Sequence, residues 1–493
     1  MKTCLAVDLG AGSGRVIAAR HDGSKISLEV VCRFDNTPVE FAGHIFWNFT
    51  QLLSDIRAGL AAGAAKYGQI ASVGVDTWGV DYGLIDKSGR LLGMPYAYRD
   101  SRNCPARTQE VFDLFGKRAL YDATGIQFMD FNTVFQLHSE ASERSSLFAL
   151  ADKLLFMPDL VNYALCGTVA NEATIASTSG LVDLSTRKFS KAVLSSIGVP
   201  ESLFSDPVAP GTVLGKVRGI PGLEGVPVVA VGSHDTASAV ASVPADPSTR
   251  WGYLATGTWA LLGLEIEKPV LGDMAYELNY THEGAVNGKF RFLKNCTGMW
   301  LVQQLRRAWT RGGEAPSWDE LVDEAERSEP FRSLVDPDWA PLAAPGRMQE
   351  KIAEYCRATS QPVPETRGQF YRAALEGIVM RYREVWRELE ELTGEKRDVL
   401  HMIGGAIRDR MHCRMAADAM KARIECGPIE GAATGNAVAQ LVGLGDAADF
   451  DEGRRIVRAS TKIDLVEPTS DGAAAWDENY ARWLETKRNA PRA

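Results

Sequence analysis

The chain has 493 residues, 46 of them glycine, and a formal net charge of −9 at pH 7. Its 45% hydrophobic and 24% charged residues exclude a wholly disordered chain, and the acidic balance argues against a protein that binds nucleic acid or an anionic membrane. The length predicts roughly two to four domains. The glycine count exceeds the roughly 35 that ordinary usage would give. The extra glycines belong either to loose turns or to backbone that approaches a ligand closely.

The first forty residues predict three strands joined by two turns. Residues 4–7, 16–19 and 26–34 are apolar or alternate in polarity, as strands do, and the first turn is Gly-Ala-Gly-Ser-Gly at 10–14. The apolar segment before it meets Asp8 too soon to be a signal peptide. No run of about 18 apolar residues occurs elsewhere, so we expect a cytoplasmic protein without membrane spans.

A helix and two buried strands follow in the first half. Asn48 can cap a helix to about residue 66, in which leucine and isoleucine recur at helical spacing. Residues 70–75 and 228–231 are apolar strand segments. The second of them runs into a short helix after Gly232.

The second half repeats this arrangement. Residues 253–263 predict a strand, a glycine turn and a strand, and 368–392 predict a long helix with a solvated charged face that includes Arg381 and Arg383. Residues 400–403 predict a strand that breaks at Gly404-Gly405 into a helix from about Arg408. The duplication indicates two related α/β domains around a cleft, over residues 1–243 and 244–493.

The turn after Asp8 has the composition of an anion-binding loop. It is neither a P-loop, because no Gly-Lys-Ser/Thr follows, nor a dinucleotide fingerprint, because Gly10, Gly12 and Gly14 are spaced two and two. A plain tight turn is one interpretation. The other is a cradle of backbone N–H groups for phosphate, in which Mg²⁺ would offset the charge of Asp8.

Two later turns have matching properties. Ala255–Trp259 offers a flexible glycine between two threonine hydroxyls, and together with the first turn it would clamp a polyphosphate from two domains. The turn at Gly404-Gly405 ends a strand and opens a helix, which suits an adenosine.

Several acidic residues sit at the ends of predicted strands. Asp235, at a strand-to-helix junction, is the candidate general base, and its alternative role is to cap the helix. Asp76 and Asp81 either hold the hydroxyls of a polyol or belong to a turn. Residues 98–102 either belong to the ligand site or form an internal ion-pair network. The eight cysteines contain no Cys-x-x-Cys pair, so we expect reduced, mostly buried thiols.

Together these residues resemble the FGGY family of carbohydrate kinases, within the actin–hexokinase superfamily of two-domain ATPases. The similarity covers essentially the whole chain in the expected order, through the segments 7–15, 157–163, 171–179, 233–239, 256–259 and 404–405. The longer segments 75–81, 95–102, 125–133 and 293–300 are similar to those of family members that act on L-rhamnulose. The resemblance implies two actin/hexokinase-like, ribonuclease H-like α/β domains around a central cleft.

The resemblance also implies ATP- and Mg²⁺-dependent phosphorylation of L-rhamnulose at its 1-hydroxyl, which gives L-rhamnulose 1-phosphate and ADP. Asp235 would accept the proton, and Asp8 would hold Mg²⁺ through water. The implied nucleotide contacts are Ala11, Gly12, Ser13, Gly14, Arg15, Thr258, Gln303, Gly404 and Gly405. The implied sugar contacts are Gly79, His234, Asp235, Thr236 and Asn295.

One segment departs from the family. The adenosine motif of the family usually has a third glycine and ends in Gln-Asn, whereas this chain has Ala406 and Arg408-Asp409. The adenine pocket therefore differs from the family pattern, although the strand–turn–helix arrangement is retained.

Two other functions stay open at this point. One is a kinase of the same family for another ketose or polyol, such as L-fuculose or xylulose. The other is an actin-like ATPase that uses the nucleotide as a switch for assembly, against which the segments 76–81 and 293–296 look like parts of a sugar pocket. The sequence carries no signal for an oligomeric state.

Overall fold

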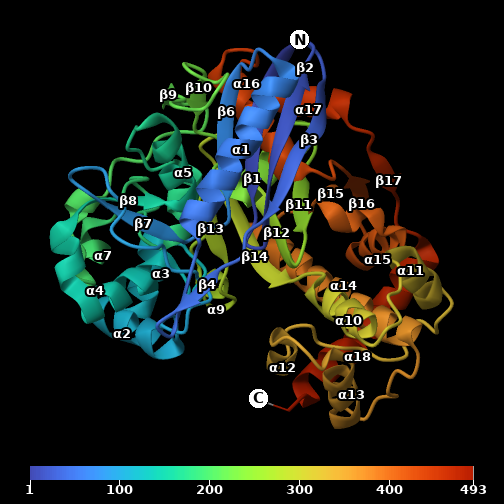
Figure 1. The fold of residues 1–493 in the computed structure, drawn as a ribbon. Coiled ribbons are helices and arrows are strands. Elements are labelled where there is room, and N and C mark those ends of the chain that lie inside the picture. The colour runs from blue at the N-terminus through green and yellow to red at the C-terminus, as the bar shows by residue number, and fades with distance from the viewer. Residues whose placement is uncertain (492–493) are drawn as a thin grey trace. The chain divides into compact units, whose positions relative to one another are not determined.

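The computed structural model describes residues 1–491, apart from the side chains of residues 144 and 145. The chain forms two compact units (Figure 1). Unit 1 comprises Met1–Pro244, Glu265–Leu293 and Glu430–Thr461, and unit 2 comprises Ala245–Leu264, Lys294–Ile429 and Lys462–Ala493. Each unit is discontinuous, because two segments of the second half of the chain belong to unit 1. The continuous domains 1–243 and 244–493 stay a prediction.

Unit 1 is built on a six-stranded sheet, in the order β3-β2-β1-β6-β10-β9. Strands β1, β6 and β10 are parallel, while β2 and β9 run antiparallel to their inner neighbours. The strands are β1 (Lys2–Leu9), β2 (Ser13–His21), β3 (Ile26–Asp35), β6 (Ser72–Thr77), β9 (Val213–Lys216) and β10 (Pro227–Val229). The strands predicted in this part of the chain are therefore confirmed, as is the α/β class.

Both faces of this sheet are covered by helices, so the central strands are apolar on both sides. Leu5 and Val7 of β1 pack with the apolar face of α1 (Phe49–Tyr67), which lies over β1, β2 and β3 in Figure 1. Ala6, on the opposite face, packs with Ala433 of α16 (Gly431–Gly443). This alternation follows from the two-residue period of a strand. As predicted, the Asn48 side chain caps α1, by accepting from the Gln51 N–H at 3.4 Å.

The rest of unit 1 consists of short hairpins and helices around a second apolar cluster. Its strands are β4 (Val39–Phe41), β5 (His44–Phe46), β7 (Tyr82–Asp86), β8 (Ala151–Phe156), β13 (Thr281–Gly284) and the start of β14 (Phe290–Thr297). Its longer helices are α2 (Pro105–Phe115), α3 (Lys117–Thr124), α4 (Thr133–Leu150), α5 (Met157–Cys166) and α17 (Phe450–Ser460). The short ones are α6 (Ala173–Ala176), α7 (Lys191–Ser196), α8 (Asp235–Ala241) and α9 (Asp273–Glu277).

Unit 2 contains five consecutive strands of a seven-stranded sheet, in the order β12-β11-β15-β16-β17. β11, β15 and β16 are parallel. The strands are β11 (Trp251–Thr256), β12 (Trp259–Ile266), β15 (Val399–Ile403), β16 (Arg423–Cys426) and β17 (Asp464–Val466). The helices are α10 (Trp300–Arg311), α11 (Trp318–Glu326), α12 (Ala340–Ala343), α13 (Met348–Ala358), α14 (Arg367–Thr393), α15 (Arg410–Met420) and α18 (Ser470–Asn489).

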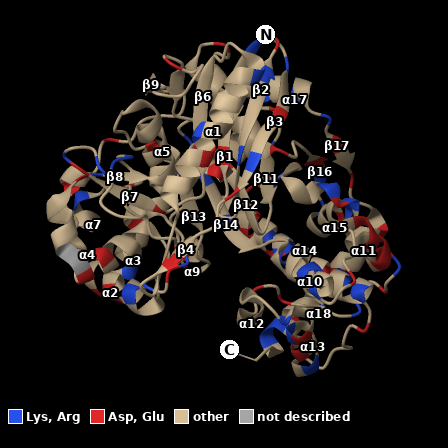
Figure 2. Cartoon of the chain, viewed as in Figure 1, with Lys and Arg blue, Asp and Glu red and all other residues tan. Residues whose placement is uncertain are grey.

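The predicted long helix is α14, which begins after a Thr366 capping box and ends at Gly394 with φ of 68°. Its predicted solvated face is wrong for two residues. Arg381 and Arg383 are 7% and 6% exposed, because Arg381 Nε donates to Asp338 Oδ2 at 2.7 Å and Arg383 Nη1 donates to the Ala419 carbonyl at 2.9 Å. Figure 2 shows basic residues on α10, acidic residues on α11 and residues of both signs on α13.

The helix predicted from about Arg408 begins later than expected. Gly404-Gly405 leads into a 3-10 helix over Gly405–Arg408, and α15 starts at Arg410. Asp409 fixes this start, because its Oδ1 accepts from the His412 N–H at 3.0 Å as an N-cap. The glycine turn is therefore followed by a tighter helix, and not directly by an α-helix N-terminus.

The remaining predictions on segments concern thiols and membrane spans. All eight cysteines are free thiols, and six of them are buried, as predicted. Across the part of the chain that the structure describes, no helix combines the length and apolarity needed to cross a membrane.

Candidate active site

Three carboxylates of unit 1 lie at the carboxyl ends of its parallel strands. The register of β1 and β6 places Asp8 opposite Asp76. Beyond β10, the chain continues this row, since the Thr77 N–H donates to the Ser233 carbonyl at 2.8 Å and Asp235 opens α8 two residues later. The carboxyl ends of parallel strands are where open α/β sheets bind ligands. The fold thus gathers Asp8, Asp76 and Asp235, although 68 residues separate the first two in the chain and 159 the last two.

Negative charge accumulates at this edge. Asp8 is 7% exposed and Asp76 is fully buried. Burial raises the pKa of both, the charge of Asp235 adds to the effect, and Arg15 opposes it at Asp8. Asp76 Oδ2 accepts from Asn436 Nδ2 at 2.6 Å, while its buried Oδ1 has no hydrogen-bond partner among the described residues. Such a cluster has the chemistry to attract a cation.

The first glycine turn is closed by its own backbone and leaves two residues open. The Gly10 N–H donates to the Ser13 carbonyl at 2.9 Å, and Gly12 and Ser13 are exposed, with Ala11 half-buried beside them. Their backbone is free to approach a phosphate. Gly14 is different, because a Cβ there would overlap the Phe34 ring, so packing already requires glycine at this position.

Arg15 lies close to the carboxylates instead of extending freely from the turn. Its Nε and Nη2 donate to Asp8 Oδ2 at 3.0 and 2.7 Å, and its Nη1 donates to Glu430 Oε2. The guanidinium is thus paired on both sides. Glu430 was not singled out in the sequence, because it joins this site from a segment 415 residues further along.

Asp235 is the most accessible of the three carboxylates, with 34% of its side chain exposed. Its alternative role as a helix cap is wrong, because the N-cap residue of α8 is His234 and Asp235 is the first residue of the helix. Thr236 Oγ1 donates to Asp235 Oδ1 at 3.0 Å, and His234 Nε2 lies 3.5 Å from the same oxygen. A partly exposed carboxylate with two neighbours at one oxygen has a geometry that suits a proton acceptor.

The Gly79 turn lies beside His234. A Cβ on Gly79 would stand 3.3 Å from Thr178 Oγ1 and 3.5 Å from His234 Nε2, so glycine keeps this approach open. The next residue, Val80, has φ of 68°, a strained conformation for a β-branched residue. Its carbonyl accepts from Thr133 Oγ1 at 2.6 Å and its N–H donates to Thr178 Oγ1 at 3.2 Å, which fixes the turn.

Of the two interpretations of Asp81, a polyol contact or a residue of a turn, the contacts of its side chain favour the structural one. Its carboxylate accepts from Trp47 Nε1 at 2.6 Å, Trp78 Nε1 at 3.0 Å and Gln136 Nε2 at 3.0 Å. Burial raises the pKa of Asp81 to about 6, although these donors oppose the rise. Both oxygens thus accept hydrogen bonds from within the protein.

The segment 98–102 forms the internal ion-pair network that was its alternative. Arg102 Nη1 donates to Glu140 Oε2 at 2.7 Å in a buried pair. Asp100 accepts from His44 Nδ1 at 3.1 Å and from the Ile45 N–H at 2.6 Å. These contacts hold the β4–β5 hairpin in place.

In unit 2, the predicted nucleotide contacts lie at the ends of β11 and β15. Thr258 Oγ1 donates to Gln303 Oε1 at 3.1 Å, which brings two of them together. Gly404 has φ of 98°, and a Cβ there would stand 2.5 Å from the Thr256 carbonyl oxygen, whereas Gly405 has open space around it. The half-buried Asn295 also belongs to unit 2, while the other predicted sugar contacts belong to unit 1.

Comparison with known proteins decides the family. The model of the N-terminal domain of the FGGY family of carbohydrate kinases matches residues 3–241, and that of the C-terminal domain matches residues 252–444. The chain belongs to this family. It is therefore a carbohydrate kinase, as the sequence predicted, and the two matches lie on either side of the predicted boundary.

Two curated relatives of the chain carry the name rhamnulokinase. A rhamnulokinase of Bacteroides thetaiotaomicron is 41% identical over 98% of this chain and 99% of its own length. A rhamnulokinase of Yersinia pestis is 36% identical over 96% of this chain and 97% of its own.

Solved FGGY-type structures share the fold at much lower identity. A xylulose kinase of Lactobacillus acidophilus superposes with a TM-score of 0.82 at 14% identity, covering 99% of this chain and 98% of that one. A glycerol kinase of Plasmodium falciparum, solved with ADP, gives 0.80 at 14% identity, covering 100% and 99%. The predicted two-domain α/β fold is confirmed by these matches.

The residues of this FGGY kinase also suit a Mg²⁺ ion held indirectly. Within residues 1–491, no group of three or more His, Cys, Asp and Glu side chains is arranged to hold a metal on its own. Mg²⁺ commonly uses one or two carboxylates, several waters and the phosphates of its substrate. Asp8 together with the unpaired Asp76 Oδ1 fits that kind of coordination.

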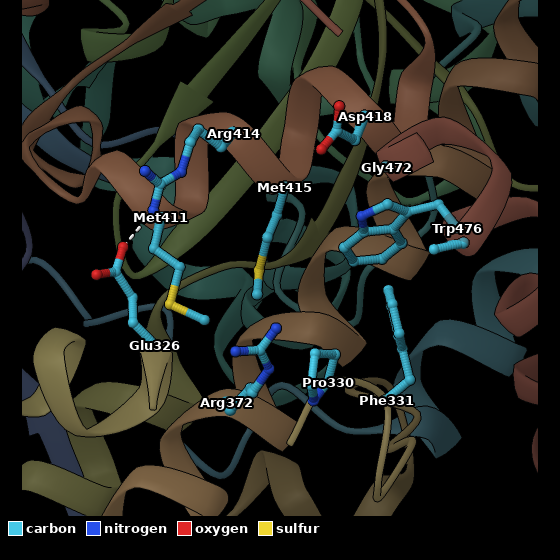
Figure 3. Close-up of a pocket in the computed structure, with 11 residues that line it drawn as sticks. Glu326, Pro330, Phe331, Arg372, Met411, Arg414, Met415, Asp418, Gly472 and Trp476 are labelled. Atoms are coloured by element: carbon cyan, nitrogen blue, oxygen red, sulfur yellow. Dashed lines mark hydrogen bonds and ion pairs between the residues drawn. The ribbon is translucent and has the colours of Figure 1, made fainter. Parts of the chain in front are cut away.

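A cavity of about 580 Å³ in unit 2 lies apart from every predicted site residue. Figure 3 shows Met411 and Met415 of α15 on one side of it, with Phe331 and Trp476 opposite. Among its charged lining residues, Arg414 donates to Glu326, Arg372 Nε donates to Glu376 at 2.7 Å, and Asp418 Oδ1 accepts from the Thr469 N–H at 2.7 Å. No predicted site residue lines this cavity.

Proposed function

We propose that this FGGY kinase transfers the γ-phosphoryl group of ATP to the 1-hydroxyl of L-rhamnulose, giving L-rhamnulose 1-phosphate and ADP. The observation that carries the proposal is the 41% identity to a rhamnulokinase over 98% of the chain. The solved xylulose and glycerol kinases, at 14% identity, support the fold and leave the choice of sugar to the closer relatives.

Asp235 is the proposed general base. Asp8 is paired with Arg15 and Asp76 is fully buried, so of the three carboxylates Asp235 is the one that a sugar hydroxyl reaches. As the hydroxyl oxygen bonds to the γ-phosphorus and the bond to ADP breaks, its proton passes to Asp235. Gly79, His234, Thr236 and Asn295 are the proposed sugar contacts.

Each unit supplies its own proposed contacts to ATP. Unit 1 offers the exposed backbone at Gly12 and Ser13, next to Ala11, Gly14 and Arg15. Unit 2 offers the Thr258–Gln303 pair and the Gly404-Gly405 turn. Bound Mg²⁺ would neutralise charge on the phosphate oxygens, held through water by Asp8 with Asp76.

We further propose that the enzyme works in the cytoplasm, as a catalyst of small-molecule metabolism. Its eight free cysteines suit a reducing compartment. Its proposed ligands are a ketose and a nucleotide, with neither nucleic acid nor membrane as a partner.

The direct test couples ADP release to NADH oxidation in the presence of ATP, Mg²⁺ and L-rhamnulose, and identifies the product by ³¹P and ¹³C NMR. We expect ADP release that depends on the sugar and saturates with it, with phosphorus attached at carbon 1. ATP turnover at the same rate without a sugar would contradict the proposal and favour the ATPase-switch alternative.

A further inference from the structure

His234 is surrounded by buried charge on the side away from Asp235. Arg291 is fully buried, Glu283 is 6% exposed and His234 is 8% exposed. Neither Arg291 nor Glu283 belongs to the predicted site residues. Because isolated buried charges are costly, the placement of an ion pair behind this ring calls for a role.

The β13–β14 hairpin assembles this ion pair. Its antiparallel register sets Glu283 directly opposite Arg291. Arg291 Nη2 donates to Glu283 Oε2 at 2.8 Å, and Arg291 Nε donates to the Gly284 carbonyl at 3.0 Å. The guanidinium is thereby held at two of its nitrogens, Nε and Nη2, which fixes the plane of its N–H bonds.

One of those bonds favours one tautomer of His234. Arg291 Nη2 lies 3.0 Å from His234 Nδ1, and a guanidinium nitrogen only donates. Glu283 Oε2 lies further from Nδ1, at 3.3 Å, and already accepts from Arg291 Nη2 at 2.8 Å. With a donor as its nearer neighbour, Nδ1 acts as the acceptor, which leaves the ring proton on Nε2. That nitrogen lies 3.5 Å from Asp235 Oδ1 and faces the open side of Gly79.

Glu283 keeps Arg291 in this position. Its Oε2 accepts from Arg291 Nη2 at 2.8 Å. Burial favours the neutral carboxyl, but the charge of Arg291 outweighs this effect and lowers the pKa of Glu283 to about 2. The ion pair therefore persists throughout the neutral range in which a kinase works.

We propose that Arg291 and Glu283 are positioning residues for phosphoryl transfer, which hold His234 with its proton on Nε2. From there the ring donates to Asp235 Oδ1 in the free enzyme and to a hydroxyl of the bound ketose in the complex, so that Asp235 is released to take the reacting proton. Only the hydrogen bond from His234 to the ketose rests on the proposed function. The ring tautomer is a property of the protein without its substrate.

The tautomer is measured on the full-length protein labelled with ¹⁵N-histidine, in which the ring nitrogen shifts distinguish Nδ1–H from Nε2–H. A His234→Gln sample assigns the signals. We expect Nε2–H in the parent protein and a loss of this preference in Glu283→Leu/Arg291→Met, which removes both charges and so leaves none buried alone. We also expect kcat/KM for the ketose to fall about 10- to 100-fold in this variant, with KM for ATP unchanged within about twofold.

Two further variants distinguish a role in positioning His234 from a general contribution to the stability of the fold. Arg291→Lys retains a donor toward Nδ1, and we expect it to restore part of both the tautomer and kcat/KM. The matched control is Glu265→Leu/Arg454→Met, which removes another buried pair of unit 1 (Arg454 Nη1 to Glu265 Oε2, 3.1 Å) and should change neither.

A proton on His234 Nδ1 in the parent protein would overturn the proposal. So would unchanged ring shifts in the Glu283→Leu/Arg291→Met variant, whether or not its activity falls. If another ketose is the better substrate, the NMR outcome is unaffected and the kinetics are measured on that sugar, so failure of the proposed function is distinguished from failure of this inference.

Discussion

Asp235 differs from its two neighbouring carboxylates in having a third of its side chain exposed. Asp8 forms an ion pair with Arg15, and Asp76 accepts a hydrogen bond from Asn436. An accessible carboxylate with Thr236 and His234 at one oxygen is poised to receive a proton. The proposed phosphoryl transfer therefore depends on this side chain more than on any other at the strand ends.

The Asp235→Asn variant keeps the shape of the side chain but cannot accept a proton. We expect kcat to fall about 10²- to 10⁴-fold, with KM for ATP within about twofold of the parent value, as measured by coupled ADP release. Asp206→Asn, at an exposed surface pair with Lys188, serves as the control and should behave like the parent. A near-parent kcat for Asp235→Asn would show that another group takes the proton.

Single residues were predictable where a motif surrounds them. Asp235 and Gly79 lie within continuous segments whose composition indicates a ligand. Arg291 and Asn436 gave no such signal, because their roles arise from contacts with His234 and Asp76, 57 and 360 residues away. Asp81 had the same local appearance as Asp76, and only its three indole and amide donors identify it as structural.

At the scale of elements, the Gly404-Gly405 turn joins β15 to the proposed nucleotide site. Gly404 has a φ that other residues rarely adopt, and it packs on the end of β11. Gly405 has neither constraint. Two adjacent glycines thus provide a matched pair for testing how tightly this turn is specified.

We expect Gly404→Ala to lower the midpoint of thermal unfolding by several degrees and to raise KM for ATP about tenfold, because the added Cβ forces the turn away from Thr256. Gly405→Ala should unfold within about two degrees of the parent. Thermal unfolding followed by circular dichroism and ATP titration in the kinase assay measure both. Equal behaviour of the two variants would mean that this turn is not specified by close packing.

Elements with a regular period were predicted well. The spacing of apolar residues gave α1 and α14 with their caps, since helix burial repeats every three or four residues. The helix predicted from about Arg408 is present, but the side chain of Asp409 starts α15 at Arg410, two residues after the expected position. Arg381 and Arg383 show that a charged helix face is buried when partners from other elements meet it.

At the scale of the whole molecule, several buried carboxylates link stability to pH. Glu172 N–H donates to Asp159 Oδ1 at 3.1 Å, and Asp159 Oδ2 has no hydrogen-bond partner among the described residues. Burial raises the pKa of Glu172 to about 7. Burial, with the nearby charge of Glu172, raises that of Asp159 well above its usual range.

These raised pKa values determine whether the free energy of unfolding rises or falls with pH. The folded state holds protons that the unfolded chain releases above about pH 4, so this contribution to stability is complete below that pH and is lost as the pH rises through about 7. We expect the unfolding midpoint to fall by a few degrees from pH 5 to pH 8. Asp159→Asn, which resembles the protonated acid, should reduce this fall, and the exposed Asp35→Asn should not. A midpoint that rises with pH over this range would contradict the assignment.

The sequence did not indicate that each unit is built from several separate segments of the chain. Residues 265–293 and 430–461 belong to unit 1, although the local pattern of each is an ordinary hairpin or helix. Hydrogen bonds such as that from Ser72 Oγ to Gln440 Oε1, at 2.7 Å, join parts of the chain that share no periodic signal. The sequence indicated the number and class of the domains, while the tertiary contacts determine which segments make up each unit.

The central claim, that this FGGY kinase acts on L-rhamnulose, is tested most directly by kcat/KM for ATP-dependent phosphorylation across a panel of L-rhamnulose, L-fuculose, xylulose and glycerol. Relative to the other three, L-rhamnulose should give the highest value, by about tenfold or more, since a site built to hydrogen-bond one set of hydroxyls discriminates against others. A higher kcat/KM for any other sugar or polyol of the panel would contradict the account.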